Sequence, residues 1–289
     1  MQACGNDFIV NRSLAQQSKS RGRAVLRLDS APVMRRLAIA ICDRHRGLGA
    51  DGFLLLLFPT DRRNDGRVRF FNADGSEAEM SGNGIRCVAR FLSASRRSPR
   101  PLRLETPAGV KEIARIPAQS GESEFRVAMG EPIFEPQRIP FRDTRAVPPL
   151  TDYPIDAGGG THRVTITSMG NPHCSLFVSS FDFDWRALGA ALERHPFFPN
   201  RTNVEFVMVV SRAEIEVRFW ERGVGETASS GTGSCGASVA SILTGRTGRR
   251  VRVRTSAGVL RVEWPEAGGV FLAGPAERIA GGAFHYSTA

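Results

Sequence analysis

The feature that most constrains this chain is an internal duplication. Three short motifs of the first half recur in the second half, and the members of each pair are 149 positions apart. The pairs are Val68-Arg-Phe-Phe-Asn72 with Val217-Arg-Phe-Trp-Glu221, Ser81-Gly-Asn-Gly84 with Ser230-Gly-Thr-Gly233, and Thr106-Pro-Ala-Gly-Val110 with Thr255-Ser-Ala-Gly-Val259. Chance rarely supplies three matches at one spacing, so the sequence predicts two copies of one α/β unit.

Both copies are predicted to contain the same elements in the same order. A strand rich in β-branched and aromatic residues leads through a Gly-containing loop to the Ser-Gly-x-Gly turn, and a helix and a further strand follow. These elements are strands Val68–Phe71, Leu102–Thr106, Ile215–Trp220 and Val251–Thr255, and helices Ile85–Ser93 and Cys235–Leu243.

A helix and a buried strand are also predicted upstream in each copy. The first helix is expected to start at Ser30, a favoured capping residue, with Pro32 in its first turn and Val33, Leu37 and Ile41 on one face. Strand Leu54–Phe58 follows it, and the later counterparts are helix Trp185–Glu193 and strand Val204–Val210.

The repeat also predicts the domain boundaries. The first domain is expected to span residues 1–130, with the tail 276–289 returning to it, and the second to span 131–275. Each copy is expected to open with a Gly-Asn pair, Gly5-Asn6 and Gly170-Asn171. The segment from Glu131 to Gly160, rich in Pro, Asp and Gly, is predicted to be the linker.

The composition is that of a globular protein, with 41% apolar and 24% charged residues among 289. The formal net charge is +10, and all basic residues except Lys19 and Lys111 are arginines. They are scattered apart from a cluster at Arg96–Arg103, which has no aromatic residue for base stacking. We therefore expect no nucleic-acid partner and attribute the charge to Arg-rich composition and to attraction of anionic substrates.

Cysteine content and hydropathy narrow the class further. Five cysteines are too few for a disulfide scaffold, and none has the spacing of a metal-ligand pair, so we expect neither disulfides nor a metal site. The sequence contains no run of about 18 apolar residues, the length that a transmembrane helix needs. The first ten residues lack the pattern of a signal peptide. The expectation is a cytoplasmic protein with no membrane partner.

The paired Ser-Gly-x-Gly turns indicate a chemistry. Glycines let the backbone approach a ligand, and the unpaired amides at a helix N-terminus bind an anion such as a carboxylate. The serine before the first glycine, Ser81 or Ser230, then lies beside the neighbouring carbon. Two such turns could place an acid and a base on opposite faces of that carbon, as inversion of a stereocentre requires. The alternative is two ordinary serine caps with no ligand.

Further motifs run in order along nearly the whole chain. They are Gly5-Asn-Asp-Phe8, Asp43-Arg-His-Arg-Gly-Leu-Gly-Ala-Asp-Gly52, Phe71-Asn-Ala-Asp-Gly-Ser-Glu-Ala-Glu-Met-Ser-Gly-Asn-Gly-Ile-Arg-Cys87, Met169-Gly-Asn-Pro-His173, Phe198-Pro-Asn-Arg-Thr-Asn203 and Glu221-Arg-Gly-Val-Gly-Glu-Thr227. Together they resemble the signature of the bacterial diaminopimelate epimerase family. The resemblance implies two pseudo-symmetric α/β (α+β) domains, each a mainly antiparallel sheet wrapped around a central helix. It also implies interconversion of LL- and meso-diaminopimelate without pyridoxal phosphate or metal, in lysine and peptidoglycan synthesis, by an isomerase that could be a homodimer.

The resemblance also implies roles for individual residues. Ser81 and Ser230 stand at the two acid/base positions, and His173 and Glu221 resemble groups that tune the acid and base. Arg222 is expected to hold the distal carboxylate of the substrate with its planar guanidinium. The implied substrate contacts are Asn6, Asn72, Gly82, Asn83, Asn171, Asn203, Glu221, Arg222, Gly231 and Thr232. Taken singly, Asn6 and Asn171 also suit turns, His173 a core position and Arg222 a surface charge.

The sequence departs from the family pattern at the two acid/base positions. The family has cysteine before both Gly-x-Gly turns, whereas this chain has Ser81 and Ser230. A thiol at a helix N-terminus can ionise near neutrality, but a serine hydroxyl is a far weaker acid that needs an adjacent base. Two smaller departures are Gly52, where many members have Gln, and Met1, which could correspond to an internal Met of longer members.

Three accounts of the serines stay open. They could act with help from His173, Glu221 and the helix N-termini. Cys87 and Cys235, one turn or more further along each helix, could take part, although core packing is the simpler prediction for them and for Cys42 and Cys174. Finally, the chain could be a racemase for another amino acid or a non-catalytic ligand-binding relative.

Overall fold

The computed structural model describes residues 1–12, 30–94, 100–117 and 123–284. Contacts divide the chain into two compact units: unit 1 comprises Met1–Val127 and Pro275–Ala289, and unit 2 comprises Ala128–Gly274. Lys19, the first half of the predicted arginine cluster (Arg96 and Arg97) and the end of the predicted C-terminal tail (285–289) lie outside the described residues.

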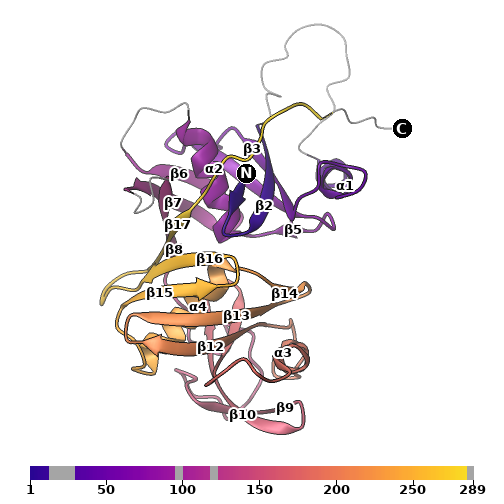
Figure 1. The fold of residues 1–289 in the computed structure, drawn as a ribbon. Coiled ribbons are helices and arrows are strands. Elements are labelled where there is room, and N and C mark those ends of the chain that lie inside the picture. Colours follow the sequence, from indigo (N-terminus) through magenta and orange to yellow (C-terminus); the bar gives the residue numbers. More distant parts are fainter. Residues whose placement is uncertain (13–29, 95–99, 118–122, 285–289) are drawn as a thin grey trace, which may run out of the picture. The chain divides into compact units, whose positions relative to one another are not determined.

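Unit 1 contains eight strands and two helices among its described residues, in indigo to purple in Figure 1. They are β1 (Gln2–Ala3), β2 (Asn6–Arg12), α1 (Ala31–Cys42), β3 (Gly52–Leu57), β4 (Gly66–Asn72), β5 (Glu77–Ala78), α2 (Gly82–Ser93), β6 (Leu102–Thr106), β7 (Gly109–Ile116) and β8 (Glu124–Gly130), the last of which ends in unit 2.

Unit 2 repeats this order after one additional strand, β9, so that β10 and β11 correspond to β1 and β2. Its elements are β9 (Tyr153–Ala157), β10 (Gly160–Ser168), β11 (Pro172–Phe177), α3 (Trp185–Glu193), β12 (Asn203–Ser211), β13 (Glu214–Glu221), β14 (Gly225–Thr227), α4 (Gly231–Leu243), β15 (Arg250–Thr255), β16 (Gly258–Glu263) and β17 (Val270–Pro275). The final residue of β17 belongs to unit 1.

The strand pairing has the same pattern in both units. Two pairs in each unit are parallel, at corresponding places: β2 with β3 and β4 with β6, and β11 with β12 and β13 with β15. The other described pairs within each unit are antiparallel. This confirms the predicted α+β class with mainly antiparallel sheets.

In each unit one helix packs on the inside of the sheet and another on the outside. The inner helix α2 contacts β1, β2 and β3, and α4 contacts strands β10 to β13, β15 and β16. The run Gly233–Ser241 of α4 is buried throughout, because its glycine, alanine and serine residues let strands approach from several sides. The outer helices are α1, which packs on β3 and β4, and α3, which packs on β9 and β12 to β14 (Figure 1).

Most predicted elements are confirmed, with shifts of at most four residues at the ends. The inner helices begin earlier than predicted, directly at Gly82 and Gly231, because each serine cap starts the helix at once. At the first helix, Ser30 is the N-cap and Pro32 lies in the first turn, but the Ser30 side chain makes no capping hydrogen bond. The predicted start of the helix at Ser30 is therefore confirmed, but the side chain does not cap it.

The predicted linker from Glu131 to Gly160 is also wrong. This segment contains strand β9, which pairs with β10. Its residues Ile139, Phe141, Leu150 and Ile155 are at most 5% exposed and belong to a core cluster of unit 2. Pro, Asp and Gly suggested a loop, but the apolar residues between them are drawn into the core by burial of their side chains. Gly170-Asn171 lies between β10 and β11, as Gly5-Asn6 lies at the turn from β1 to β2, so the two pairs are at matched places, although strands precede both.

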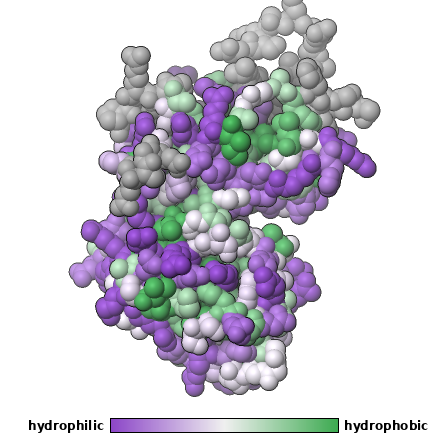
Figure 2. Space-filling model, viewed as in Figure 1, coloured by the Kyte–Doolittle hydropathy of each residue, from purple (hydrophilic) through white to green (hydrophobic). Residues whose placement is uncertain are grey.

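No helix in the described part of the chain is long and apolar enough to cross a membrane. Hydrophilic residues cover much of the face of unit 2 drawn in Figure 2, where β15 and β16 lie in Figure 1. Arg250, Arg252 and Arg254 are exposed along β15. All three form ion pairs with Glu214, Glu216 or Glu263.

Candidate active site

Ser81 is the N-cap of α2, with an extended backbone (φ −134°, ψ 117°). Its Oγ accepts a hydrogen bond from the Gly84 amide at 3.0 Å, and its carbonyl accepts one from the Ile85 amide at 2.9 Å. Among the described residues, no backbone acceptor bonds the amides of Gly82 and Asn83. These two first-turn amides therefore remain for an anion at the positive end of the helix dipole.

Ser230 repeats this geometry in unit 2. It caps α4 with nearly the same backbone (φ −133°, ψ 128°), and its Oγ accepts from the Gly233 amide at 3.1 Å. Its carbonyl accepts from the amide and the hydroxyl of Ser234, at 3.0 and 2.6 Å. The amides of Gly231 and Thr232 again have no backbone acceptor in the described ranges. The two turns are thus matched, down to the free amides.

A chain of hydrogen bonds fixes the turn of unit 1 from behind. Arg86 has no exposed surface, and it donates to Oδ1 of Asn83 at 2.8 Å and to the Gly82 carbonyl at 3.1 Å. Asn83 donates to Oδ1 of Asn6 at 2.5 Å, and Asn6 donates to Asp51 at 3.1 Å. The predicted site residues Asn6, Gly82 and Asn83 are therefore brought together, around an arginine that the sequence analysis did not single out.

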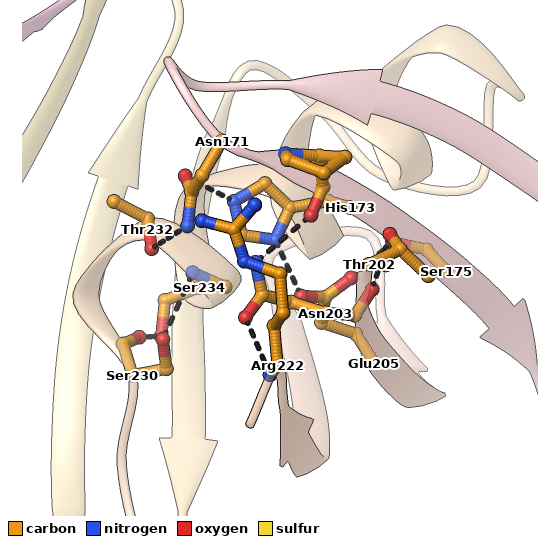
Figure 3. A network of polar contacts seen from close by, with 12 residues as sticks. Asn171, His173, Ser175, Thr202, Asn203, Glu205, Arg222, Ser230, Thr232 and Ser234 are labelled. Atoms are coloured by element: carbon orange, nitrogen blue, oxygen red, sulfur yellow. Dashed lines mark hydrogen bonds and ion pairs between the residues drawn. The ribbon is translucent and has the colours of Figure 1, made fainter. Parts of the chain in front are cut away.

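A second network lies behind the turn of unit 2 (Figure 3). His173 is fully buried between β11 and α4; its Nδ1 is 2.6 Å from Oε1 of Glu205 and its Nε2 is 3.0 Å from Oδ1 of Asn171. The other carboxylate oxygen of Glu205 accepts from Ser175 at 3.1 Å. Asn171 donates to Oγ1 of Thr232 at 3.4 Å. This network joins the predicted residues Asn171, His173 and Thr232.

Glu221, at the end of β13, lies next to this network. Burial raises the pKa of the Glu221 carboxyl above its usual value, whereas hydrogen bonding to Ser230 and the charge of His173 lower it, and the charge of Glu205 raises it further. The Ser230 hydroxyl thus has a carboxyl group of raised pKa as its neighbour. In unit 1 no carboxylate among the described residues is hydrogen-bonded to Ser81.

Asn203 and Arg222 lie at the adjoining ends of β12 and β13. Asn203 is 7% exposed, and it donates to the Pro172 carbonyl at 2.9 Å and accepts from the Arg222 amide at 3.0 Å. Both atoms of its amide are thus used to join backbone segments. The Arg222 guanidinium is exposed and has one long bond, 3.4 Å to the Asn200 carbonyl, so it is available to a ligand.

Asn72 and Gly52 lie at the adjoining ends of β4 and β3 in unit 1, where unit 2 has Glu221 and Asn203. Asn72 is exposed and donates to Ser76 at 2.9 Å. Gly52 pairs with Asn72 across β3 and β4. A Cβ at Gly52 would lie 2.9 Å from the Phe71 carbonyl oxygen and 3.2 Å from the Phe8 ring. A side chain as large as glutamine would not fit here unless these neighbours moved.

All five cysteines are buried, which confirms the predicted core packing of Cys42, Cys87, Cys174 and Cys235. Burial raises the pKa of the Cys87 thiol to about 12, and Arg86 offsets only part of this effect. Cys235 has no exposed surface. Both thiols therefore lie within the core, without an exposed surface that could meet a substrate. Across the described ranges, no three His, Cys, Asp or Glu side chains are grouped to hold a metal ion.

Two residues that the sequence analysis missed are prominent here: Arg86 and Glu205. Both are charged side chains that are at most 1% exposed, and Glu205 lies in the otherwise apolar run Val204–Val210. A charge within an apolar stretch was the available signal, since charged residues are rarely fully buried unless they are paired. The sequence could not reveal which partners would surround them.

Comparison with solved structures identifies the class of fold. A probable proline racemase from Agrobacterium radiobacter matches with a TM-score of 0.64 at 17% identity, covering 95% of this chain and 88% of that one. A hydroxyproline epimerase from Agrobacterium vitis matches with a TM-score of 0.62 at 18% identity, covering 95% and 87%. At these identities the match shows the fold alone, which this chain shares with a probable proline racemase and a hydroxyproline epimerase.

Comparison of sequences is more specific. The family model for diaminopimelate epimerase matches residues 2–135 and 165–279. The diaminopimelate epimerase of Pelotomaculum thermopropionicum is 47% identical over 262 residues, 87% of this chain and 89% of the relative. That of Desulforudis audaxviator is 45% identical over 284 residues, covering 96% and 95%. The chain belongs to the diaminopimelate epimerase family, and the resemblance inferred from its motifs is confirmed.

Proposed function

We propose that this protein interconverts LL- and meso-diaminopimelate by cofactor-independent proton transfer at the α-carbon. Membership of the epimerase family supports the substrate and the reaction. The observation that carries the mechanism is the pair of matched turns, each with a capping serine and two free amides. Inversion needs a base on one face of the carbon and an acid on the other, and each unit supplies one such turn.

The backbone amides have the role of stabilising charge. Removal of the α-proton leaves negative charge that spreads onto the α-carboxylate. The amides of Gly82 and Asn83, and of Gly231 and Thr232, are preorganised donors at helix N-termini, so they bind that carboxylate without reorganisation. The exposed guanidinium of Arg222 suits the distal carboxylate, which it can bind through two parallel hydrogen bonds.

The serines must exchange protons that cysteines would exchange more easily. On the side of unit 2, the Cα–H bond breaks as Ser230 Oγ takes the proton, and the hydroxyl proton of Ser230 passes to the Glu221 carboxylate. On the side of unit 1, delivery of a proton by Ser81 leaves an alkoxide, and no described carboxyl group is hydrogen-bonded to it. We therefore expect slow turnover, limited by the Ser81 step.

Isotope exchange tests this proposal. The protein is incubated with LL-diaminopimelate in deuterated water, and α-deuterium and the meso isomer are measured at high enzyme concentration. We expect both to appear slowly. The double variant Ser81→Cys/Ser230→Cys should accelerate exchange by roughly 10²-fold or more, because a thiolate forms readily near neutrality. No exchange by either protein would refute the proposed reaction; exchange by the wild type without any gain in the double variant would refute the placement of the acid and base.

A racemase for another amino acid is the second candidate, and the exposed Arg222 guanidinium, which makes one long hydrogen bond, discriminates between the two. A substrate without a distal carboxylate would leave this guanidinium without a bound partner, at a cost of about 1–3 kcal/mol if the site closes over it. Exchange measured with lysine, which lacks that carboxylate, separates the two. Faster exchange with lysine than with diaminopimelate would favour the second candidate.

A further inference from the structure

A buried glutamate at the end of an outer helix holds the turn that contains Arg222. Glu193 is the last residue of α3 and is 3% exposed. Its Oε1 atom accepts a hydrogen bond from the Gly223 amide at 2.8 Å, and its Oε2 atom accepts one from the Trp220 indole at 3.0 Å. Trp220 precedes Arg222 by two positions and Gly223 directly follows it, at the turn from β13 to β14. The carboxylate is therefore bonded to the chain on both sides of Arg222.

The same glutamate also contacts the loop on which the Arg222 side chain rests. The backbone carbonyl of Glu193 accepts from the Thr202 amide at 3.1 Å, and Nη1 of Arg201 donates to its Oε1 at 3.5 Å. The Arg222 guanidinium meets this loop through its hydrogen bond of 3.4 Å to the Asn200 carbonyl. Both the backbone and the side chain of Arg222 thus lie on segments that Glu193 joins.

The charge of Glu193 suits a group that ties several donors together. An ionised carboxylate can only accept hydrogen bonds, and both oxygens of Glu193 have donors. Burial alone would raise the pKa of this carboxyl, but hydrogen bonds from Gly223 and Trp220 and the charges of Arg194 and Arg201 outweigh it, so the pKa is lower than usual. The group is therefore ionised at neutral pH and stays an acceptor on both sides.

Helix α3 is joined to the same region by a second, weaker contact. Arg186, in the first turn of α3, donates to both carboxylate oxygens of Glu226 in β14, at 2.6 and 2.9 Å. These two side chains are 56% and 45% exposed, and an ion pair at such a surface contributes little. The buried Glu193 is thus the stronger connection between α3 and the turn, and the Asn203 side chain, which accepts from the Arg222 amide at 3.0 Å, supports the turn from β12 (Figure 3).

We propose that Glu193 is a positioning residue, which fixes Arg222 for the distal carboxylate of the substrate by tying the turn from β13 to β14 and the loop at residues 200–202 to the end of α3. The proposal rests on the proposed function, because it assigns that carboxylate to Arg222. A guanidinium binds a carboxylate through two parallel hydrogen bonds only in a matching orientation, and a supporting residue held by packing maintains that orientation. Glu193 thus contributes to substrate affinity without touching the substrate.

Amide hydrogen exchange, followed by NMR of the intact protein, tests this contact without any assay of activity. In the wild type we expect the Gly223 amide to be protected, because a buried carboxylate accepts its hydrogen. Glu193→Met has a side chain of similar length without the carboxylate. It should accelerate exchange at Gly223 about 10-fold more than at Val217, a buried residue of β13 that reports the change in global stability. Glu193→Gln retains one acceptor oxygen, so its effect should be smaller.

The kinetics of α-deuterium incorporation provide the second measurement. Arg222 would bind the distal carboxylate equally in the ground state and in the transition state. Glu193→Met should therefore raise KM for diaminopimelate about 10-fold with little change in kcat. A merely structural role would instead reduce the amount of folded protein, which lowers the apparent kcat and leaves KM unchanged.

Arg186→Met is the matched control, since it removes the exposed contact between α3 and β14 and leaves Glu193 in place. It should retain the protection of Gly223 and the wild-type KM. The proposal is wrong if Gly223 exchange in folded Glu193→Met changes no more than Val217 exchange, or if kcat falls at unchanged KM. If Glu193→Met does not fold, Glu193→Gln replaces it in both measurements and the same outcomes decide. Absence of deuterium incorporation in the wild type would refute the proposed function instead, and the protection of Gly223 would still show whether Glu193 holds the turn.

Discussion

The serine turns of the two units have the same backbone geometry, but the side chains behind them differ. Behind Ser230, unit 2 has His173, Glu205 and the partly buried Glu221. In unit 1 the strand pairing puts Phe8 and Gly52 where unit 2 has His173 and Asn203. Two residues further along, Leu54 stands in the place of Glu205. The two units thus share the serine turn, and the titratable groups that lie behind it in unit 2 have no counterpart at these positions of unit 1.

In the inner helices the charged residue is in unit 1, whereas unit 2 has an uncharged one. Arg86 of α2 occupies the position that Cys235 occupies in α4, and Cys87 occupies that of Gly236. In unit 1, the turn is therefore held by the permanent charge of Arg86 within the helix. In unit 2, ionisable groups of the sheet lie behind the turn, and His173 can approach α4 only because residue 236 is a glycine. The comparison indicates that anion binding is common to both turns, whereas the capacity to accept a proton is concentrated in unit 2.

The largest expected effect compares the two single cysteine variants. Ser81→Cys should accelerate α-proton exchange by roughly 10²- to 10³-fold, because unit 1 has no described base beside its serine. Ser230→Cys should give a clearly smaller gain, since Glu221 already assists Ser230. Exchange rates of both variants in deuterated water check this. Equal gains would contradict the asymmetry between the units.

Removal of the fixed charge should mainly affect stability. Arg86→Met leaves Asn83 and the Gly82 carbonyl without a buried donor, so we expect a loss of about 3 kcal/mol in the free energy of unfolding. Urea denaturation measures it. The matched substitution in unit 2, Cys235→Ala, removes a smaller buried group and should cost about 1 kcal/mol. A larger loss for Cys235→Ala would reverse the ranking.

The pH dependence should depend on unit 2. Burial raises the pKa of Glu221, and its carboxylate form accepts the proton, so kcat should rise as the pH increases through that pKa, above the usual value of 4.5. Glu221→Gln should remove this rising limb and lower kcat about 10²-fold.

Since a raised pKa favours folding of the protonated form, the contribution of Glu221 to stability is full below pH 4.5 and is lost at higher pH. The Gln variant should therefore gain stability relative to the wild type as pH rises; a wild-type rising limb that persists in the variant would exclude Glu221 as the base.

The smallest expected effect concerns the glycine that admits the histidine. Gly236→Ala gains helix propensity, but its Cβ would lie 2.8 Å from His173 Cγ, so we expect a net loss of about 1–2 kcal/mol and a shifted His173 NMR signal. Cys87→Ala at the matched position of unit 1 should leave that signal unchanged. A stabilised Gly236→Ala protein with an unshifted signal would show that the contact is not tight.

Much of the fold was predictable because short-range sequence signals indicate its elements and because the duplication repeats those signals in both units. Strand Leu102–Thr106 and helix Trp185–Glu193 were predicted to the residue, since composition and capping act over a few positions. The segment from Glu131 to Gly160 was mispredicted as a linker because turn residues surround the few side chains that enter the core. Of the candidate site residues, those in the turns were indicated by the duplicated motif and the rest by family resemblance. Arg86 and Glu205 were indicated by neither.

The sequence by itself determined the duplication, the two serine turns and the family, because these depend on the order of residues and on short-range propensity. Only the tertiary structure decided which charges are buried and with which partners: Arg86 with Asn83, and His173 with Glu205. The reason is physical. The free energy of a buried charge depends on donors and acceptors brought from distant parts of the chain, and so it is settled only when strands and helices pack.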